Sequence, residues 1–428
     1  MEREAATKRM YERSVLDNGL KVITSSMPHS RSVSVAVLVG AGSCYEDEEE
    51  AGISHFAEHV FFKGTRRRPT AGDISREIEG VGGVINASTD KEVTTFWCKV
   101  AAAHFRLALD VLSDVVLESR FDEAEIEKER QVVLEEIKMN LDLPQHRVGS
   151  LVEELLWPGQ PLGRDIAGYK ETVVTTERGR LLDYVGRRYV PNNTVVSVAG
   201  AVEHEEAVRE VESLWGRWGP RDVSNGYESQ SVQHGPQVRS ELKEGQQAHL
   251  CLAVHGFSRF DPRRFALGLL NTVLGGGMSS RLFTEIRENQ GLAYDIHSYV
   301  ETFRYSGSFV TYAGVDPGKL RVAVEAILKE LSKVRGGVPD DELFRAKEHS
   351  KGQLQLRLED SHRVALWLGG QELLRGQILD VDEVLSIIDS ISAQELAQVA
   401  EEVLQSQRLN LAVVAPQGDA ASVAWLRL

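Results

Sequence analysis

The sequence predicts an α+β fold built from two copies of one unit. Strand, helix and glycine patterns between residues 34 and 199 recur in the same order between residues 249 and 414. A stretch rich in Gly, Ser, Asn and Gln separates the two copies. Ordered recurrence of this kind indicates repeated structural units. We therefore expect a repeat over 1–218, a linker over 219–239 and a repeat over 240–428, each a mainly antiparallel sheet packed against helices.

The first copy alternates strand and helix signals. Strands are predicted over 20–24, 32–39, 82–89, 93–100 and 194–199. Helices are predicted over 70–80, 102–118, 122–139 and 205–215. Asn18-Gly19 is a hairpin turn signal, and Thr70 is a candidate helix cap. The acidic run from Glu46 to Glu50 is expected to be a solvated loop.

Residues 52–65 predict a buried helix with three functional side chains. At about 100° per residue, His55, Glu58 and His59 share one face of that helix. Imidazoles at positions i and i+4 are neighbours and can bind one metal ion. Glu58 lies between them, where it can reach a metal-bound water without being a ligand. The order H-x-x-E-H is the inverzincin motif. The alternative is a structural cluster of two His and one Glu.

The second copy lacks this chemistry. When it is aligned with the first copy, Leu267, Leu270 and Asn271 occupy the places of the two histidines and the glutamate. We therefore expect one active and one inactive repeat.

A third metal ligand is expected from the helix around residues 126–137. Glu129 and Glu136 are seven residues apart and fall within an apolar stripe that extends to Val132. Glu135 points the opposite way, toward solvent. A carboxylate on a buried face is costly unless it is paired or metal-bound. Either Glu136 or Glu129 is therefore the expected ligand, and the alternative is a buried Glu paired with an Arg.

Charge and composition exclude several classes of partner. The chain has 428 residues, with 49 Lys and Arg against 64 Asp and Glu, and a formal net charge of −15. This balance argues against nucleic acid and anionic membranes as partners. The three cysteines show no disulfide or zinc-ribbon spacing. Residues 1–4 lack the apolar core of a signal peptide and no run approaches 18 apolar residues, so we expect a cytoplasmic protein.

The motifs in order resemble those of the pitrilysin, insulysin and mitochondrial processing peptidase family. His55-Phe56-Ala57-Glu58-His59 is followed after 136 − 59 = 77 positions by Glu136. The resemblance covers nearly the whole chain and also rests on residues 86–89, 127–137, 161–164, 189–193, 275–283 and 287–294. By length the chain resembles the short bacterial processing-protease-like branch, which implies a clam-shell metallopeptidase.

The resemblance implies a role for each metal-site residue. His55, His59 and Glu136 would bind zinc, one Zn²⁺ per chain. Glu58 would be the general base, and Glu129 a supporting acidic residue.

The resemblance also implies a substrate strand and a second group of catalytic residues. Asn86 and Ala87 would lie on the edge strand that receives substrate. Arg287 and Tyr294 would face the reaction centre from the second repeat. Because this chain has both the metal set and the Arg/Tyr pair, it favours a homodimer with composite active sites over an obligate pair of unlike subunits. Residues 144–147 lack the acidic residues of mitochondrial processing enzymes, which weakens the case for arginine-directed presequence cleavage.

The function expected from the sequence is a zinc-dependent endopeptidase. It would hydrolyse unstructured peptides in a chamber, with Glu58 as general base. The alternative is a non-catalytic core or peptide-binding subunit of a larger assembly. Such subunits typically lose the metal residues, whereas every one is present here.

Overall fold

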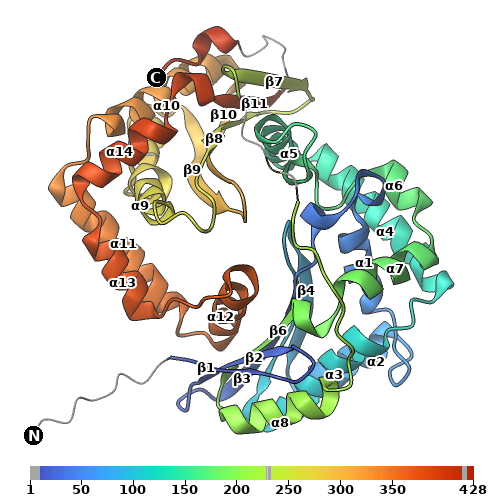
Figure 1. The fold of residues 1–428 in the computed structure, drawn as a ribbon. Helices are drawn as coiled ribbons and strands as arrows, with labels where there is room; N and C mark the ends of the chain where they lie inside the picture. Colours follow the sequence, from blue (N-terminus) through green and yellow to red (C-terminus); the bar gives the residue numbers. More distant parts are fainter. Residues whose placement is uncertain (1–9, 228, 230–232, 417–421) are drawn as a thin grey trace, which may run out of the picture. The chain divides into compact units, whose positions relative to one another are not determined.

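A computed structural model describes residues 10–227, 229, 233–416 and 422–428 (Figure 1). The described residues form two sheets and many helices, which confirms the α+β prediction. They group into two compact units. The first consists of the described residues within Met1–Glu135, Ile166–Tyr227 and Gln355–Glu383, and the second of those within Glu136–Asp165, Glu228–Leu354 and Val384–Leu428.

The first sheet contains the predicted strands and one more. Its spatial order is β1 (Glu12–Val15), β2 (Lys21–Ser26), β6 (Thr194–Gly200), β3 (Ser32–Val39), β5 (Thr94–Ala101) and β4 (Val84–Thr89). Only β2 and β6 run parallel to each other. The unpredicted β1 pairs with β2 across a turn in which Gly19 has φ +86°, as the Asn18-Gly19 signal requires. Strand β4 forms one edge of the sheet.

The second sheet repeats this order without an equivalent of β1. Its strands are β7 (Gln237–Leu242), β11 (Asn410–Ala415), β8 (Ala248–His255), β10 (Gly307–Val315) and β9 (Ala293–Thr302). β7 and β11 are parallel, as β2 and β6 are in the first sheet. Each strand therefore has a counterpart in the first sheet, which confirms two copies of one unit. β7 begins at Gln237, inside the range 219–239 that was predicted as linker. Residues 228 and 230–232 of that linker lie outside the described part.

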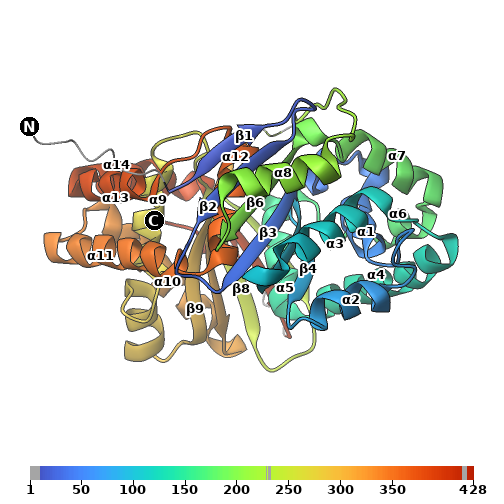
Figure 2. The ribbon, with the colours of Figure 1, turned by 90° about the horizontal axis from the view of Figure 1, so that it is seen from below.

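The helices of the first unit cover both faces of its sheet. They are α1 (Ile53–Phe61), α2 (Ala71–Glu79), α3 (Phe105–Glu118), α6 (Lys170–Thr175), α7 (Arg178–Arg188), α8 (His204–Trp215) and α12 (Ser361–Arg375). Figure 2 shows α3 and α8 lying along one face of the sheet. Thr70 caps α2 in a capping box with Asp73, which confirms the predicted cap.

The helices of the second unit enclose its own apolar core. They are α5 (Pro144–Leu156), α9 (Arg264–Gly275), α10 (Leu320–Arg335), α11 (Asp340–Arg357), α13 (Val381–Ser390), α14 (Ala393–Val403) and the π-helix η6 (Phe283–Asn289). Buried leucines and valines of α9, α10 and α14 pack with those of β8 and β10. Helix α4 (Glu123–Asp142) begins in the first unit, and its residues from Glu136 onward are grouped with the second.

Two helices pack on a sheet that is distant from them in sequence. α12 covers β2, β3 and β6, and the hydroxyls of Ser361 and Ser34 lie 2.9 Å apart. α5 covers β7, β8 and β11, and Trp157 after it donates its indole N–H to the Ser306 hydroxyl at 3.0 Å. The sequence patterns predicted neither helix. Because α5 and α12 pack on these sheets, each compact unit is made of several separate segments of the sequence. The repeat limits 1–218 and 240–428 stay a prediction.

No helix in the described ranges is long and apolar enough to cross a membrane.

Candidate metal centre

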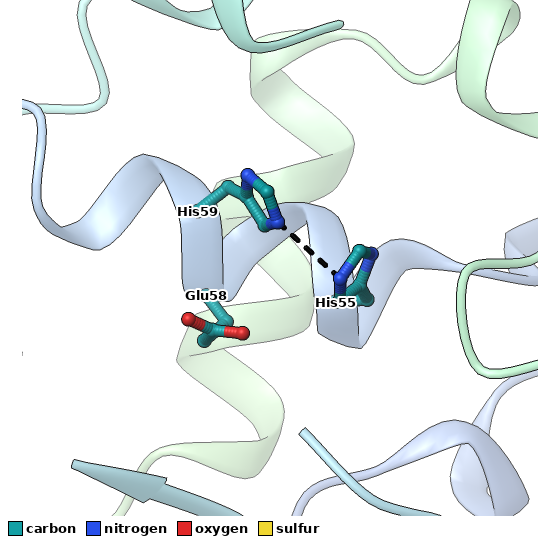
Figure 3. A group of neighbouring side chains, drawn as sticks. All are labelled: His55, Glu58 and His59. Atoms are coloured by element: carbon teal, nitrogen blue, oxygen red, sulfur yellow. Dashed lines mark hydrogen bonds between the residues drawn. The ribbon is translucent and has the colours of Figure 1, made fainter. Parts of the chain in front are cut away.

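Helix α1 brings three potential ligand groups into one cluster. The Nε2 atoms of His55 and His59 lie 3.3 Å apart. Figure 3 shows both rings and the Glu58 carboxylate on the same helix, with the contact between the rings dashed. One ligand atom each from His55, Glu58 and His59 falls within 4.8 Å of the others. His55 is buried, and the other two are half-buried. The i, i+4 spacing produces this arrangement because residues four apart are neighbours on a helix surface.

The spacing of the two histidines fits a shared zinc ion. Zinc binds imidazole nitrogen at about 2.0–2.1 Å in tetrahedral geometry, so two such nitrogens lie about 3.3–3.4 Å apart. The observed 3.3 Å between the His55 and His59 Nε2 atoms matches that value. The donor set, two imidazoles with a carboxylate close by, is also one that zinc prefers.

Glu129 lies against the other nitrogen of His59. Its Oε2 is 3.3 Å from Nδ1 of His59, and its Oε1 is 2.7 Å from Nζ of Lys63. A carboxylate at Nδ1 fixes the ring orientation and leaves Nε2 to face a metal. Of the two carboxylates that the sequence left open as third ligand, Glu129 is therefore placed behind His59.

The carboxylates of α4 differ in exposure as the helical wheel predicts. Glu129 is buried, Glu136 is half-buried and Glu135 is exposed. Glu136 follows Glu129 by seven residues, about two helical turns along the same face. Val132, however, is 48% exposed, so the apolar stripe does not extend as far as the sequence suggested.

The edge strand β4 ends beside Glu58. Thr89, its last residue, donates its hydroxyl to Oε2 of Glu58 across a long 3.4 Å contact. Asn86 is exposed and Ala87 is half-buried on the same strand, and the Asn86 side chain accepts the Ala87 backbone N–H at 2.8 Å. Among the described residues β4 is the outermost strand of its sheet, so both residues lie on an edge strand, and their role in binding substrate stays a prediction.

Glu46 is a supporting residue that the sequence analysis missed. Its carboxylate accepts the backbone N–H groups of Gly52 and Ser54, both at 2.8 Å, and so caps the first turn of α1. Glu46 is only 4% exposed and Glu50 is also buried, with Arg187 at 2.8 Å. The predicted solvated loop is therefore wrong at both positions. The sequence did contain a signal for this role, because the residue before α1 is Gly52, which cannot cap the helix with a side chain, and Glu46 precedes it by six positions.

A buried pair of hydroxyls joins α1 to α7. The hydroxyls of Ser54 and Tyr184 lie 2.6 Å apart. Burial raises the pKa of the Tyr184 phenol, with the nearby Glu46 carboxylate acting in the same direction. Tyr184 therefore holds α1 as a neutral hydroxyl over the physiological pH range.

In the second unit, α9 occupies the place of α1 without its chemistry. Leu267 and Leu270 are fully buried in the core, and Asn271 accepts the Ser298 hydroxyl at 2.7 Å. The positions that align with His55, Glu58 and His59 thus hold two buried leucines and a hydrogen-bonded asparagine, which agrees with the inactive repeat expected from the sequence.

Arg287 and Tyr294 are neighbours in the second unit. The Arg287 guanidinium lies 5.6 Å from the centre of the Tyr294 ring. Gly291, with φ +58°, separates η6 from β9, so Tyr294 falls at the start of a strand as expected. Tyr294 is 76% exposed, so its phenol is available to a reactant or a partner surface.

Comparisons with known proteins match nearly the whole chain. Residues 21–170 match the family model "Insulinase (Peptidase family M16)", and residues 176–349 match "Peptidase M16 inactive domain". The chain is 36% identical to the zinc protease YmxG of Bacillus subtilis, over 96% of this chain and 100% of that protein. It is 37% identical to a zinc protease of Mycobacterium leprae, over 97% of this chain and 94% of that protein.

Solved structures share the same fold. A protease from Helicobacter pylori superposes with a TM-score of 0.88 at 23% identity, covering 95% of this chain and 100% of that one. A peptidase M16 inactive domain from Pseudomonas fluorescens superposes with a TM-score of 0.87 at 17% identity, covering 96% of this chain and 100% of that one.

Proposed function

The chain belongs to the insulinase family, peptidase family M16, and on that basis we propose that it is a zinc-dependent endopeptidase acting on unstructured peptides. The observation that carries this proposal is the cluster on α1, where two imidazole Nε2 atoms lie 3.3 Å apart with the Glu58 carboxylate beside them. Relatives more than 30% identical over almost their full length are named zinc proteases.

The proposed zinc ligands are His55, His59 and Glu136, with one ion per chain. The spacing of the two Nε2 atoms supports the first two ligands. The half-buried position of Glu136, against the exposed Glu135, supports the third. A catalytic zinc site takes three protein ligands and keeps one position open, which this set satisfies.

The chain's own residues would carry the proton transfers. Bound zinc would supply a Lewis acid that polarises the scissile carbonyl and acidifies water. Glu58 would accept a proton from the attacking water on its carboxylate and deliver it to the leaving nitrogen. The Thr89 hydroxyl, 3.4 Å from Oε2 of Glu58, would limit rotation of that carboxylate. The exposed Tyr294 phenol would donate to the oxyanion that develops at the carbonyl.

Substrate would bind by adding a strand to β4. Among the described strands, β4 pairs only with β5, so its outer edge offers backbone N–H and C=O groups to an extended peptide. Asn86 and Ala87 lie in the middle of this edge. Because backbone pairing reads side chains weakly, we expect broad sequence specificity.

We propose that the site is enclosed in a chamber, which would select substrates by their folding state. A disulfide-stabilised globular protein should resist cleavage, whereas the same protein after reduction and alkylation should be degraded. Only an unfolded chain can enter a closed chamber and extend along an edge strand. Mass spectrometry of products from the two forms, at equal concentration, measures the difference. Cleavage of both forms at similar rates would argue against a chamber.

We propose a homodimer with composite sites, because the metal set on α1 belongs to the first unit and the Arg287 and Tyr294 pair to the second. Each site would take zinc from one chain and the Arg/Tyr pair from the other. Glu58→Gln and Arg287→Ala should each be nearly inactive alone but active when mixed. A freely exchanging 1:1 mixture contains about half mixed dimers with one intact site each, so about a quarter of wild-type activity should return.

The control for this complementation is subunit exchange itself. Differently tagged chains that co-purify establish that mixed dimers have formed. If they form and no activity returns, Arg287 and Glu58 act within one chain and the trans site is wrong.

A further inference from the structure

We propose that Lys63 is a positioning residue of the zinc centre, which acts through Glu129 on the ring of His59. The inference rests on the proposed function, because it concerns the same site. Lys63 follows His59 by four residues, just as His59 follows His55. It lies in the turn that closes α1, where its backbone N–H bonds to the carbonyl of Val60 at 3.0 Å.

The two oxygens of Glu129 are held by two different donors from this segment. Oε1 lies 2.7 Å from the Lys63 ammonium, and Oε2 lies 3.3 Å from Nδ1 of His59. A carboxylate held at only one oxygen can rotate about its terminal bond, whereas one held at both cannot do so without breaking a contact. Lys63 therefore fixes the plane of the Glu129 carboxylate, and through it the direction in which His59 presents Nε2.

The burial of Glu129 makes its contact with Lys63 important for the orientation of the carboxylate. The Glu129 side chain is 9% exposed, so water cannot readily replace a lost donor. The Lys63 side chain is 28% exposed, so it can be replaced without opening a cavity in the core. Lys63 can therefore be substituted without disturbing the core, and the substitution should still change how His59 is oriented toward the metal.

The alternative explanation is that Lys63 and Glu129 form an ordinary ion pair, which contributes only to the folding stability of the protein. A purely structural pair would show its effect in the metal-free protein, because loss of Lys63 leaves Oε1 of the buried Glu129 carboxylate without that donor and lowers thermal stability. A positioning role predicts instead a change in zinc affinity without a matching change in the thermal stability of the metal-free protein. These two quantities separate the explanations.

The test measures zinc affinity of the full chain by competition with a chromophoric chelator. Lys63→Met should weaken zinc binding about tenfold, the lower end of the range for residues that orient metal ligands. Lys63→Arg, which keeps a charged donor, should bind zinc nearly as tightly as wild type. The matched control is Lys128→Met, because Lys128 makes an exposed ion pair with Glu125 on α4, and it should leave zinc affinity unchanged.

A double-substitution cycle shows whether the effect passes through Glu129. In a Glu129→Gln background, Lys63→Met should cause no further loss of zinc affinity, because the intermediary is already altered. Equal losses in both backgrounds, or no loss in either, would overturn the positioning role. A parallel drop in the melting temperature of the metal-free protein that accounts for the loss would overturn it as well.

The same titration separates this inference from the proposed function. If wild type itself binds no zinc, the proposed function and the inference both fail. If wild type binds zinc and Lys63→Met binds it equally well, only the inference fails.

Discussion

Glu58→Gln should keep zinc bound and the fold intact while losing peptidase activity by a factor on the order of a hundred or more. Glu58 belongs to the cluster on α1 but is not among the proposed ligands. Gln has nearly the same shape and can still accept the Thr89 hydroxyl, but its amide cannot take a proton from water at neutral pH. The loss should therefore fall on turnover and not on metal content. Hydrolysis of a quenched peptide and zinc content, measured on one preparation, test both statements.

The control is a second Glu→Gln substitution in the first unit, at a glutamate far from the proposed chemistry in the sequence. Glu79→Gln on α2 replaces an exposed glutamate and should leave activity at the wild-type level. Substantial turnover by Glu58→Gln at full zinc occupancy would mean that another group takes the proton.

Loss of a proposed ligand should empty the zinc site. Wild type should contain about one zinc per chain, and His59→Ala and Glu136→Gln should each contain close to none after dialysis, because two remaining protein ligands hold zinc weakly. Elemental analysis against protein concentration measures this directly.

The matched control lies next to Glu136 on the same helix. Glu135 is exposed, so Glu135→Gln should keep full zinc content. The reverse outcome, zinc kept by Glu136→Gln and lost by Glu135→Gln, would show that the assignment of faces on α4 is wrong.

Local sequence signals were sufficient to predict much of the structure of the first unit. The capping box at Thr70, the turn at Asn18-Gly19 and the α1 cluster all depend on residues within a few positions of each other. Such signals act over one turn of chain and so survive in any tertiary context. The repeat could also be predicted, since segments that match in sequence form equivalent strands, and these strands have the same spatial order in both sheets.

Features that depend on distant partners could not be predicted. Helices α5 and α12 pack on sheets made of remote segments, and no pattern within either helix identifies that sheet. Glu46 was missed for another reason: it belongs to an acidic run of ordinary surface composition, although it caps a helix that begins only a few residues later. The role of Lys63 likewise depends on Glu129, 129 − 63 = 66 residues later.

X-ray absorption at the zinc edge of the wild-type protein tests the ligand set of the metal centre most directly. We predict two imidazole ligands, with all nearest atoms nitrogen or oxygen at about 2.0–2.2 Å from the metal. Cys44, Cys98 and Cys251 are buried, and burial raises the pKa of each thiol, so none should contribute. A sulfur atom at about 2.3 Å, or fewer than two imidazoles, would contradict a zinc centre built on His55 and His59.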